Sequence, residues 1–290
     1  MTKVKIVTDS TVDLPADEMK TLSVTVVPLT VTIDGKSYQD GVDITAKEFL
    51  QKLKQSDDIP KSSQPAAGEF KRIYDELGAD GSEVISIHMS SGMSGTYQSA
   101  VQAAEMTNTT VHTVDSAFIS IALSFQVKEA AELAEKENGV EEILDRLEQV
   151  RKRTSLYIMV DTLEYLVKGG RIGRGRALVG SLLKIKPIAS LQDGVYTPVS
   201  KVRTYSQMIK QMKQQLEQDC QHASIKGIGI AQAGAEKLAG DLKQSLSGLD
   251  VPESFPIVDT TPIISTHTGP GALALMYYTE ERSGHEEDSR

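Results

Sequence analysis

Short apolar segments alternate with longer amphipathic ones through the first half of the chain, and this alternation limits the fold more than any other feature. Segments rich in β-branched and other apolar residues predict strands at 4–10, 24–33, 83–89 and 111–116. Amphipathic spacing predicts helices at 45–55, 68–77, 97–106 and 124–136. Strands and helices that alternate in this way form a mostly parallel sheet that is covered by helices on both faces.

The pattern changes after a charged helical segment at 140–153. Strands are predicted at 155–160, 187–202, 224–232 and 272–278, and helices at 204–218 and 235–246. Asp193 and Gly194 lie within the second of these strand segments, and Asp-Gly between strand residues indicates a hairpin. A chain of 290 residues usually forms more than one domain. We therefore expect one α/β domain over 1–154, a second α/β domain with an antiparallel pair over 155–280, and a polar tail over 281–290 that includes His285, which is not expected to be a ligand.

Charge and cysteine content exclude several classes of function. A net charge of −9 and a pI of about 5.2 disfavour nonspecific binding to nucleic acid or to an anionic membrane surface. The single cysteine, Cys220, excludes an internal disulfide and a multi-cysteine metal site. No segment has the pattern of a signal peptide or of a transmembrane helix. We expect a cytoplasmic protein.

Two hydroxyl-rich turns follow predicted strands of the first half. One comprises residues 8–11, and the other is SSGMSGT at 90–96. Parallel strands end at one edge of their sheet, where α/β proteins bind ligands, so the two turns are expected to lie together. A helix start needs only one capping hydroxyl, whereas the second turn has four, and helix N-termini favour anions. This predicts a site for a polar or anionic group, and its predicted edge comprises Asp9, Ser10, Ser63, Gly95 and Thr96.

Three other stretches carry candidate site residues. Taken alone, KSSQPAAGEF at 61–70 predicts helix capping followed by proline at the helix start. The Gly-rich loop 168–180 carries Arg171, Arg174 and Arg176; such a loop is usually solvated, but its guanidinium groups also suit a phosphate or a partner's carboxylates. Arg203 lies at a strand-to-helix junction, where a surface role is usual. His267 is predicted to lie in a turn before Gly269-Pro270-Gly271.

Several familiar chemistries lack their motifs. The sequence has no GxxxxGK[ST] phosphate loop, no GxGxxG after the first strand, no HExxH and no Cys/His cluster, so independent ATP hydrolysis, dinucleotide redox chemistry and zinc catalysis are unsupported. Residues 92–96 nearly match the GxSxG nucleophile elbow. Ser94, Asp259 and His267 also follow the hydrolase order of nucleophile, acid and base, so spacing alone leaves a serine hydrolase open.

Five segments together resemble the DegV family. In order along the chain they are IVTDSTVDLP, KSSQPAAGEF, SSGMSGTYQSA, KGGRIGRGRA and THTGPGA, and they span nearly its whole length. The resemblance implies a three-layer α/β/α domain with a parallel sheet, followed by a second, two-layer α/β domain with a mixed sheet. It also implies an acyl chain buried in a tunnel, in the fatty-acid-binding subunit of a bacterial two-component fatty acid kinase.

The resemblance also implies roles for particular residues. The hydroxyls that bind the fatty-acid carboxylate would be those of Ser62 and Ser94, and His267 would complete their hydrogen-bond network. The family usually has threonine where this chain has Ser62, and serine keeps the hydroxyl. Arg171 and Arg203 would face the kinase or the new phosphate.

The function expected from this resemblance is that of a carrier with no catalytic activity alone. It would present a long-chain fatty acid to a separate kinase that holds ATP and Mg²⁺, and it would then carry the acyl phosphate to an acyltransferase of phospholipid synthesis. No metal or cofactor of its own is expected. The alternatives are a passive lipid store or sensor and, as above, a serine hydrolase that uses Ser94 and His267.

Overall fold

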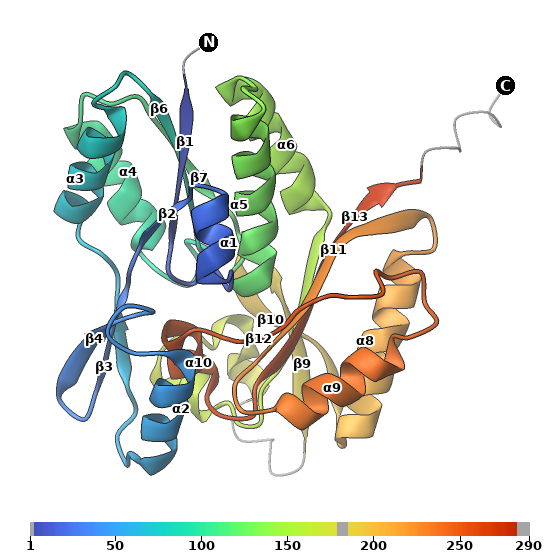
Figure 1. Cartoon of the computed structure of the whole chain (residues 1–290). Coiled ribbons are helices and arrows are strands. Elements are labelled where there is room, and N and C mark those ends of the chain that lie inside the picture. The colour runs from blue at the N-terminus through green and yellow to red at the C-terminus, as the bar shows by residue number, and fades with distance from the viewer. Residues whose placement is uncertain (1–2, 179–184, 283–290) are drawn as a thin grey trace, which may run out of the picture.

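Two main sheets and their helices make up the computed structural model, which describes residues 3–178 and 185–282 (Figure 1). The strands are β1 (Val4–Asp9), β2 (Thr25–Val27), β3 (Thr30–Ile33), β4 (Lys36–Gln39), β5 (Lys61–Ser63), β6 (Glu83–His88), β7 (Val111–Asp115), β8 (Thr154–Met159), β9 (Lys186–Gln192), β10 (Val195–Val202), β11 (Ala223–Gln232), β12 (Ile257–Asp259) and β13 (Leu273–Glu281). The helices are α1 (Ala16–Thr21), α2 (Ala46–Gln55), α3 (Ala67–Gly78), α4 (Thr96–Met106), α5 (Ser120–Glu135), α6 (Val140–Lys152), α7 (Glu164–Lys168), the 3-10 helix η1 (Gly173–Leu178), α8 (Tyr205–Asp219), α9 (Glu236–Ser245) and α10 (Pro262–Thr268). Most of the predicted polar tail, with His285, lies outside the described residues.

The first sheet is parallel and lies between two helical layers, as predicted. Its strand order is β2-β1-β6-β7, and every pairing is parallel. Helices α3 and α4 cover one face, and α5 and α6 lie on the other (Figure 1). Neighbouring residues of one strand therefore enter different cores: Val7 packs with Phe70 and Tyr74 of α3, whereas Ile6 belongs to the core on the α5 side. This burial on both faces explains the continuous apolar strands.

The second sheet is mixed, in the order β10-β9-β8-β13-β11-β12. Only the β11–β12 pairing is parallel. Asp193 and Gly194, both with positive φ (52° and 71°), join β9 to β10 in the predicted hairpin. Helices α8 and α9 pack on one face of this sheet, where Met208 and Met212 meet Leu273 and Leu275. The division of the chain into domains near Thr154 stays a prediction.

Helix α5 connects the two sheets. One of its sides packs on β1 and β6 of the first sheet, and another packs on β8, β11 and β13 of the second. Its residues Ser120–Val127 are all buried. The strand-end edge of the first sheet thereby faces the surface of the second sheet that α8 and α9 leave uncovered (Figure 1).

A small antiparallel sheet, β4-β3-β5, corrects two predictions. The predicted strand 24–33 is two strands, because Pro28 has no N–H for a continuous ladder; β2 joins the first sheet and β3 joins the small one. Residues 61–63 pair with β3 as β5, so they do not cap α3. That helix has Ala66 as its N-cap and no side-chain capping bond, so the capping interpretation is wrong.

The histidine predicted to lie in a turn belongs to a helix. Residues 262–268 form α10, which begins with Pro262 at its first position and is followed by Gly269 with φ 73°. Proline at a helix start and glycine after its end are ordinary helix boundaries, so the turn prediction for His267 is wrong. Helix α10 packs against α2, α7, β3 and β5, and this packing brings His267 next to the small sheet.

Candidate functional site

A cavity lies between the strand-end edge of the first sheet and the free face of the second. It contains about 840 Å³ of space unoccupied by protein atoms, counting space that opens to solvent. Most of its lining is apolar, from residues such as Leu29, Met89, Ile158, Ile264 and Met276. Polar residues also line it, namely Ser62, Ser94, Ser120, Arg171, Tyr196, Gln232, Thr260, His267 and Thr268. This mostly apolar lining suits a long apolar molecule that carries a polar group.

The second sheet forms the apolar floor of this cavity. Antiparallel pairing aligns Ile158 with Ala274 and with Ala189, and aligns Ala274 with Ala231, so one row across the sheet consists mostly of small residues. The next row contains larger side chains, because Leu156 pairs with Met276. A row of alanines beside a row of larger residues leaves a trough along the sheet surface.

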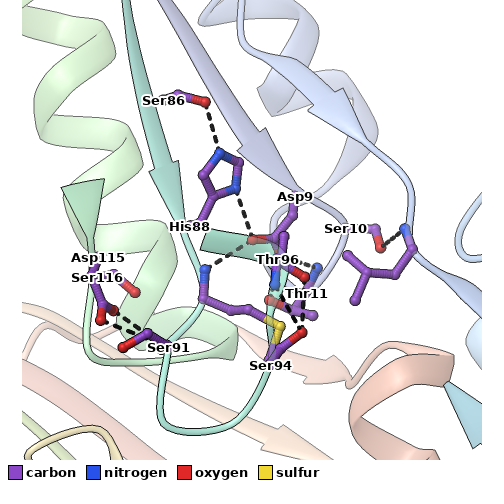
Figure 2. Close-up of polar contacts among 12 residues, drawn as sticks. Asp9, Ser10, Thr11, Ser86, His88, Ser91, Ser94, Thr96, Asp115 and Ser116 are labelled. Carbon is purple, nitrogen blue, oxygen red and sulfur yellow. Dashed lines mark hydrogen bonds and ion pairs between the residues drawn. The ribbon is translucent and has the colours of Figure 1, made fainter. Parts of the chain in front are cut away.

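Asp9 organises the polar edge of the first sheet (Figure 2). Its carboxylate accepts hydrogen bonds from the Thr11 hydroxyl (2.6 Å), the Thr11 amide (3.0 Å) and the Met89 amide (2.8 Å), and it lies 3.1 Å from Nδ1 of His88. Burial alone would raise the pKa of Asp9, but the hydrogen bond and charge of His88, with the bonds from Thr11 and Met89, bring it below its ordinary value. His88 bonds in turn to Ser86 through Nε2 (2.7 Å). An ionised Asp9 thus fixes the start of the turn that follows β6.

The hydroxyls of the Ser90–Thr96 turn have different tasks. Ser90 donates to the carbonyl of Gly194 (2.7 Å) and so joins the turn to the β9–β10 hairpin. The Ser94 side chain lines the cavity, and its hydroxyl lies 2.9 Å from the hydroxyl of Thr96. The Ser94 oxygen also accepts a hydrogen bond from the Thr96 amide at the start of α4 (3.2 Å). Gly95 permits a close approach, because a Cβ there would lie 2.3 Å from the side chain of Gln64. The turn therefore carries several hydroxyls, as expected, but of its four only the hydroxyl-bearing side chain of Ser94 lines the cavity.

Ser62 and His267 meet at the polar end of the cavity. The Ser62 hydroxyl lies 2.7 Å from Nε2 of His267, although the two residues are 205 positions apart in the chain. Burial, and then the charge of Arg171, lower the pKa of His267 to about 4, so its imidazole is neutral at neutral pH. Within the described part of the chain, Nδ1 of His267 is buried without a hydrogen-bond partner. The small sheet and α10 therefore deliver a neutral Ser-His pair to the cavity.

The two arginines named from the sequence lie in different environments. Arg171 lines the cavity, and it donates from Nε to the carbonyl of Met93 (3.0 Å) and from Nη1 to that of Gly169 (2.6 Å). Its Nη2 makes no hydrogen bond to a described residue. Arg203 is exposed between β10 and α8 and is not part of the cavity lining.

The five residues predicted at the edge of the site lie behind its lining or beside it. Asp9 and Thr96 are buried beneath the turn, and the Ser10 hydroxyl donates to Asp40 (2.9 Å). Gly95 contacts Gln64, and Ser63 is exposed on β5. None of the five contributes to the lining of the cavity.

The arrangement does not assemble the hydrolase triad, because His267 pairs with Ser62 rather than with Ser94. The Asp259 carboxylate accepts a hydrogen bond from Gln232, and its Oδ2 lies 3.9 Å from Nζ of Lys47. Among the residues that the structure describes, no group of three or more His, Cys, Asp and Glu side chains could hold a metal ion. Over the same residues, no helix combines the length and apolarity needed to cross a membrane.

Sequence reasoning missed the apolar lining. Ala274 and Met276 line the cavity from alternate positions of β13, whereas Leu275 between them and Tyr277 after them enter the core beneath α8 and α9. Alternation in ALALMYY could have indicated that the two faces differ, but both faces are apolar, so the sequence did not reveal which one adjoins a cavity.

Comparisons with known proteins agree with this architecture. Residues 3–280 match the family described as "Uncharacterised protein, DegV family". A DegV domain-containing protein of Staphylococcus aureus is 42% identical over 276 residues, which cover 95% of this chain and 99% of the relative. One from Listeria monocytogenes is 39% identical over 284 residues, which cover 97% of this chain and the whole relative.

Solved structures with the same fold are described as fatty-acid-binding. A DegV family protein from Thermus thermophilus, described by its fatty acid binding, has a TM-score of 0.90 and 32% identity and covers 96% of this chain and all of its own. DegV of Bacillus subtilis, described as a fatty acid binding protein, has a TM-score of 0.89 and 32% identity and covers 97% of this chain and all of its own.

Proposed function

This chain belongs to the DegV family, and on that premise we propose that its cavity binds a long-chain fatty acid and presents the carboxylate to a separate ATP-dependent kinase. The protein then carries the acyl phosphate to an acyltransferase. The observation that supports this best is that an apolar sheet face and the side chains of Ser62, Ser94, Arg171 and His267 line the same cavity. One end suits a hydrocarbon chain, and the other suits its carboxylate.

Affinity in this proposal comes from the apolar floor. Burying about sixteen carbons at ~0.8 kcal/mol per methylene gives a gross gain on the order of 12 kcal/mol, before the costs of binding. The small side chains of Ala231 and Ala274, which line the cavity, leave room for the acyl chain beside Leu156 and Met276. The carboxylate can then be held by groups that orient it rather than by a strong charge trap.

The Ser62–His267 pair supplies one such group. Because Nδ1 of His267 has no described partner, the tautomer with its proton on Nε2 avoids burying an unpaired N–H. In that tautomer Nε2–H donates to the Ser62 oxygen over 2.7 Å, and the Ser62 hydroxyl proton is free to donate to a carboxylate. Ser94 provides a second hydroxyl from the turn before α4. Two such hydrogen bonds offset the cost of burying the carboxylate's oxygens.

Arg171 is restrained so that it cannot grip the carboxylate with two nitrogens. Its Nε and Nη1 are already bonded to the carbonyls of Met93 and Gly169, which leaves Nη2 for the ligand. A bidentate arginine would compete with the kinase for the oxygen that attacks phosphorus. A single N–H can instead steady the charge of the carboxylate and then of the acyl phosphate. The exposed Arg203 is available to the partner rather than to the ligand.

Phosphoryl transfer itself is assigned to the partner. Transfer from ATP depends on positioning, Mg²⁺ and charge stabilisation, and this chain lacks a phosphate loop. In this proposal the chain holds no cofactor, and it fixes the nucleophilic carboxylate oxygen of the bound fatty acid beside Ser62 and Ser94. A passive lipid store would bind the same ligand but would gain nothing from a kinase.

Native mass spectrometry of the purified protein, followed by extraction, tests the binding step. We expect one long-chain fatty acid per chain, or uptake of one after removal of lipid. A protein that is empty and takes up no added fatty acid would contradict the proposal. Incubation of the loaded protein with ATP, Mg²⁺ and a fatty acid kinase then tests the second step. Formation of acyl phosphate only in the presence of the kinase supports the carrier role. If no acyl phosphate forms even with the kinase, the proposed function is reduced to lipid storage.

A further inference from the structure

The carboxylate of Asp13 joins three separate segments just behind the cavity wall. It accepts hydrogen bonds from the hydroxyl of Ser120 at the start of α5, from the Thr260 hydroxyl (2.8 Å) and from the Thr261 amide (3.0 Å). Asp13 itself follows β1 and is 7% exposed. Ser120 and Thr260 both line the cavity, so two of the three bonds hold lining residues from behind.

Residues 259–263 form a wall one chain thick between the cavity and an open groove. Thr260 and Ile263 line the cavity, whereas Asp259, Thr261 and Pro262 line the groove. Asp13 lies on the groove side as well. This wall leads directly into α10, which carries His267 to the polar end of the cavity. Any loosening of the wall therefore changes both the enclosure of the cavity and the position of the histidine.

The backbone at Ser120 indicates that this junction is held under strain. Ser120 has φ 62°, in the left-handed region that is unfavourable for a residue with a Cβ. Its amide donates to the carbonyl of Thr11 (2.9 Å), and its hydroxyl donates to Asp13. The segment that follows β1 thus holds both polar groups of Ser120 in place. Without the Asp13 carboxylate, one fewer hydrogen bond would hold Ser120 in its left-handed backbone conformation.

We propose that Asp13 is a positioning residue for the ligand site: by tying α5 to the segment before α10, it keeps the inner wall closed and sets how long an acyl chain stays bound. This inference rests on the proposed function for its ligand, but the closure of the wall is a property of the protein alone. Asp13 touches lining residues and not the ligand. Its loss should therefore act mainly on the dissociation rate rather than on the association rate.

Asp13→Asn tests this, with Asp219→Asn as a matched control. Asp219 also accepts bonds from several side chains, among them Tyr277 (2.6 Å) and Gln215 (2.9 Å), but it lies on the face of the second sheet turned away from the cavity. The probe is parinaric acid, a fluorescent long-chain fatty acid. After the protein has been loaded with it, its dissociation is measured by stopped-flow fluorescence. We expect Asp13→Asn to raise its dissociation rate constant roughly tenfold, as the loss of charge-assisted bonds would do. Asp219→Asn should change it less than about twofold while lowering the melting temperature.

Hydrogen exchange separates this inference from the proposed function. In Asp13→Asn, amide exchange should rise in 117–123 and 258–268, with or without ligand. If the wild type binds no parinaric acid, the proposed function fails and the exchange result alone decides: increased exchange confined to these two segments supports the positioning role, and unchanged exchange overturns it. If the wild type binds, an Asp13→Asn dissociation rate within twofold of wild type overturns it.

Thr260→Val provides a second route if Asp13→Asn folds poorly. It removes one of the three donors with little change in shape, and we expect a smaller increase in dissociation, of about threefold. Combined with Asp13→Asn, its effect should be less than multiplicative, because both changes act on the same contact between Thr260 and residue 13. Fully multiplicative effects would overturn the proposed connection.

Discussion

The two sheets contribute to the cavity in different ways. The first sheet contributes the ends of its strands: β1 and β6 both end in polar turns that Asp9 holds together. The second sheet contributes a face, in which Ile158 and Ala274 lie in register. Strand ends expose backbone amides and small hydroxyls, whereas a sheet face offers only side chains. In this molecule the polar part of the site is therefore built by turns, and the apolar part by a sheet surface.

In the proposed function, this difference separates the residues that orient the carboxylate from those that provide affinity for the acyl chain. The hydroxyls of the turns and the imidazole of His267 can be changed with little loss of buried apolar area, and the alanines of the floor can be changed without removing a side-chain hydrogen bond. Substitutions in the two regions should consequently affect different measurements. The following predictions test that separation, beginning with the largest effect.

Filling the floor should have the largest effect on binding. Ala274→Phe places a ring in the middle of the row of small residues, where Ala274 is 7% exposed. Excluding about four methylenes from the trough would cost ~3 kcal/mol, so we expect affinity for a C16 acid to fall by at least about 100-fold in a fluorescence titration. Binding of a short-chain acid should change far less. Unchanged affinity for the long chain would place the acyl group elsewhere.

Removal of a turn hydroxyl should chiefly affect phosphorylation. For Ser94→Ala we expect acyl phosphate formation with the kinase to fall by about 100-fold, because a misplaced oxygen is a poor nucleophile. Fatty-acid affinity should fall by less than about tenfold. Ser91→Ala is the matched control, since Ser91 lies in the same turn with an exposed side chain. If Ser94→Ala left phosphorylation unchanged, its hydroxyl would have no role in orienting the head group.

Buried carboxyls on the polar side should make stability depend on pH. Burial, partly opposed by the hydrogen bond from Ser10, raises the pKa of Asp40 to about 7, and burial likewise raises the pKa of Asp13 to about 6. The folded chain then holds these protons more tightly than the unfolded chain, so the free energy of unfolding should decrease as pH rises from about 4 to about 7.

Asp40→Asn should remove the larger part of that dependence. Between pH 5 and pH 7 we expect the wild type to lose on the order of 2 kcal/mol relative to this variant, measured by urea unfolding. Asp145→Asn, at an exposed position of α6, should follow the wild-type curve. Parallel curves for wild type and Asp40→Asn would show that Asp40 does not keep its proton in the folded chain.

The smallest effect is expected for a hydroxyl in the apolar region. The Tyr196 hydroxyl is buried in the cavity lining and has no partner among the described residues. Tyr196→Phe should therefore leave the free energy of unfolding unchanged or raise it by up to about 1 kcal/mol, and should leave affinity for a saturated acid within about threefold. A large loss of affinity, measured by the same titration, would show that the floor also contributes a polar contact.

Sequence patterns predicted the sheets well because each strand satisfies local rules. Asp193-Gly194 gave the hairpin correctly since only residues tolerant of positive φ fit its two positions. Two local signals indicate features that the apolar patterns alone do not: Pro28 divides the segment 24–33, and Pro262 with Gly269 marks the two ends of α10. The small sheet was not predictable from Lys61–Ser63 alone, because a three-residue polar strand exists only through its pairing with β3.

The site could be predicted only in part, because some of its contacts depend on tertiary packing. The resemblance named Ser62, Ser94, Arg171 and His267, and the structure brings these four to one cavity. The contact between Ser62 and His267 depends on how α10 packs against the small sheet, which no local pattern contains. The trough of alanines depends on the register of four strands, so composition could not reveal it.

Helix α5 has a consequence for folding. Because it packs on both sheets, Ile6 and Ile85 of the first belong to the same continuous core as Leu156 and Met276 of the second. A chain cut near Thr154 would leave one side of α5 without its apolar partner. The two halves should therefore unfold in one cooperative transition, and neither half should be stable alone. A molecule built in this way should not open by a hinge motion between the two sheets. In the proposed function, a fatty acid must therefore enter and leave through local fluctuations of the wall formed by residues 259–263.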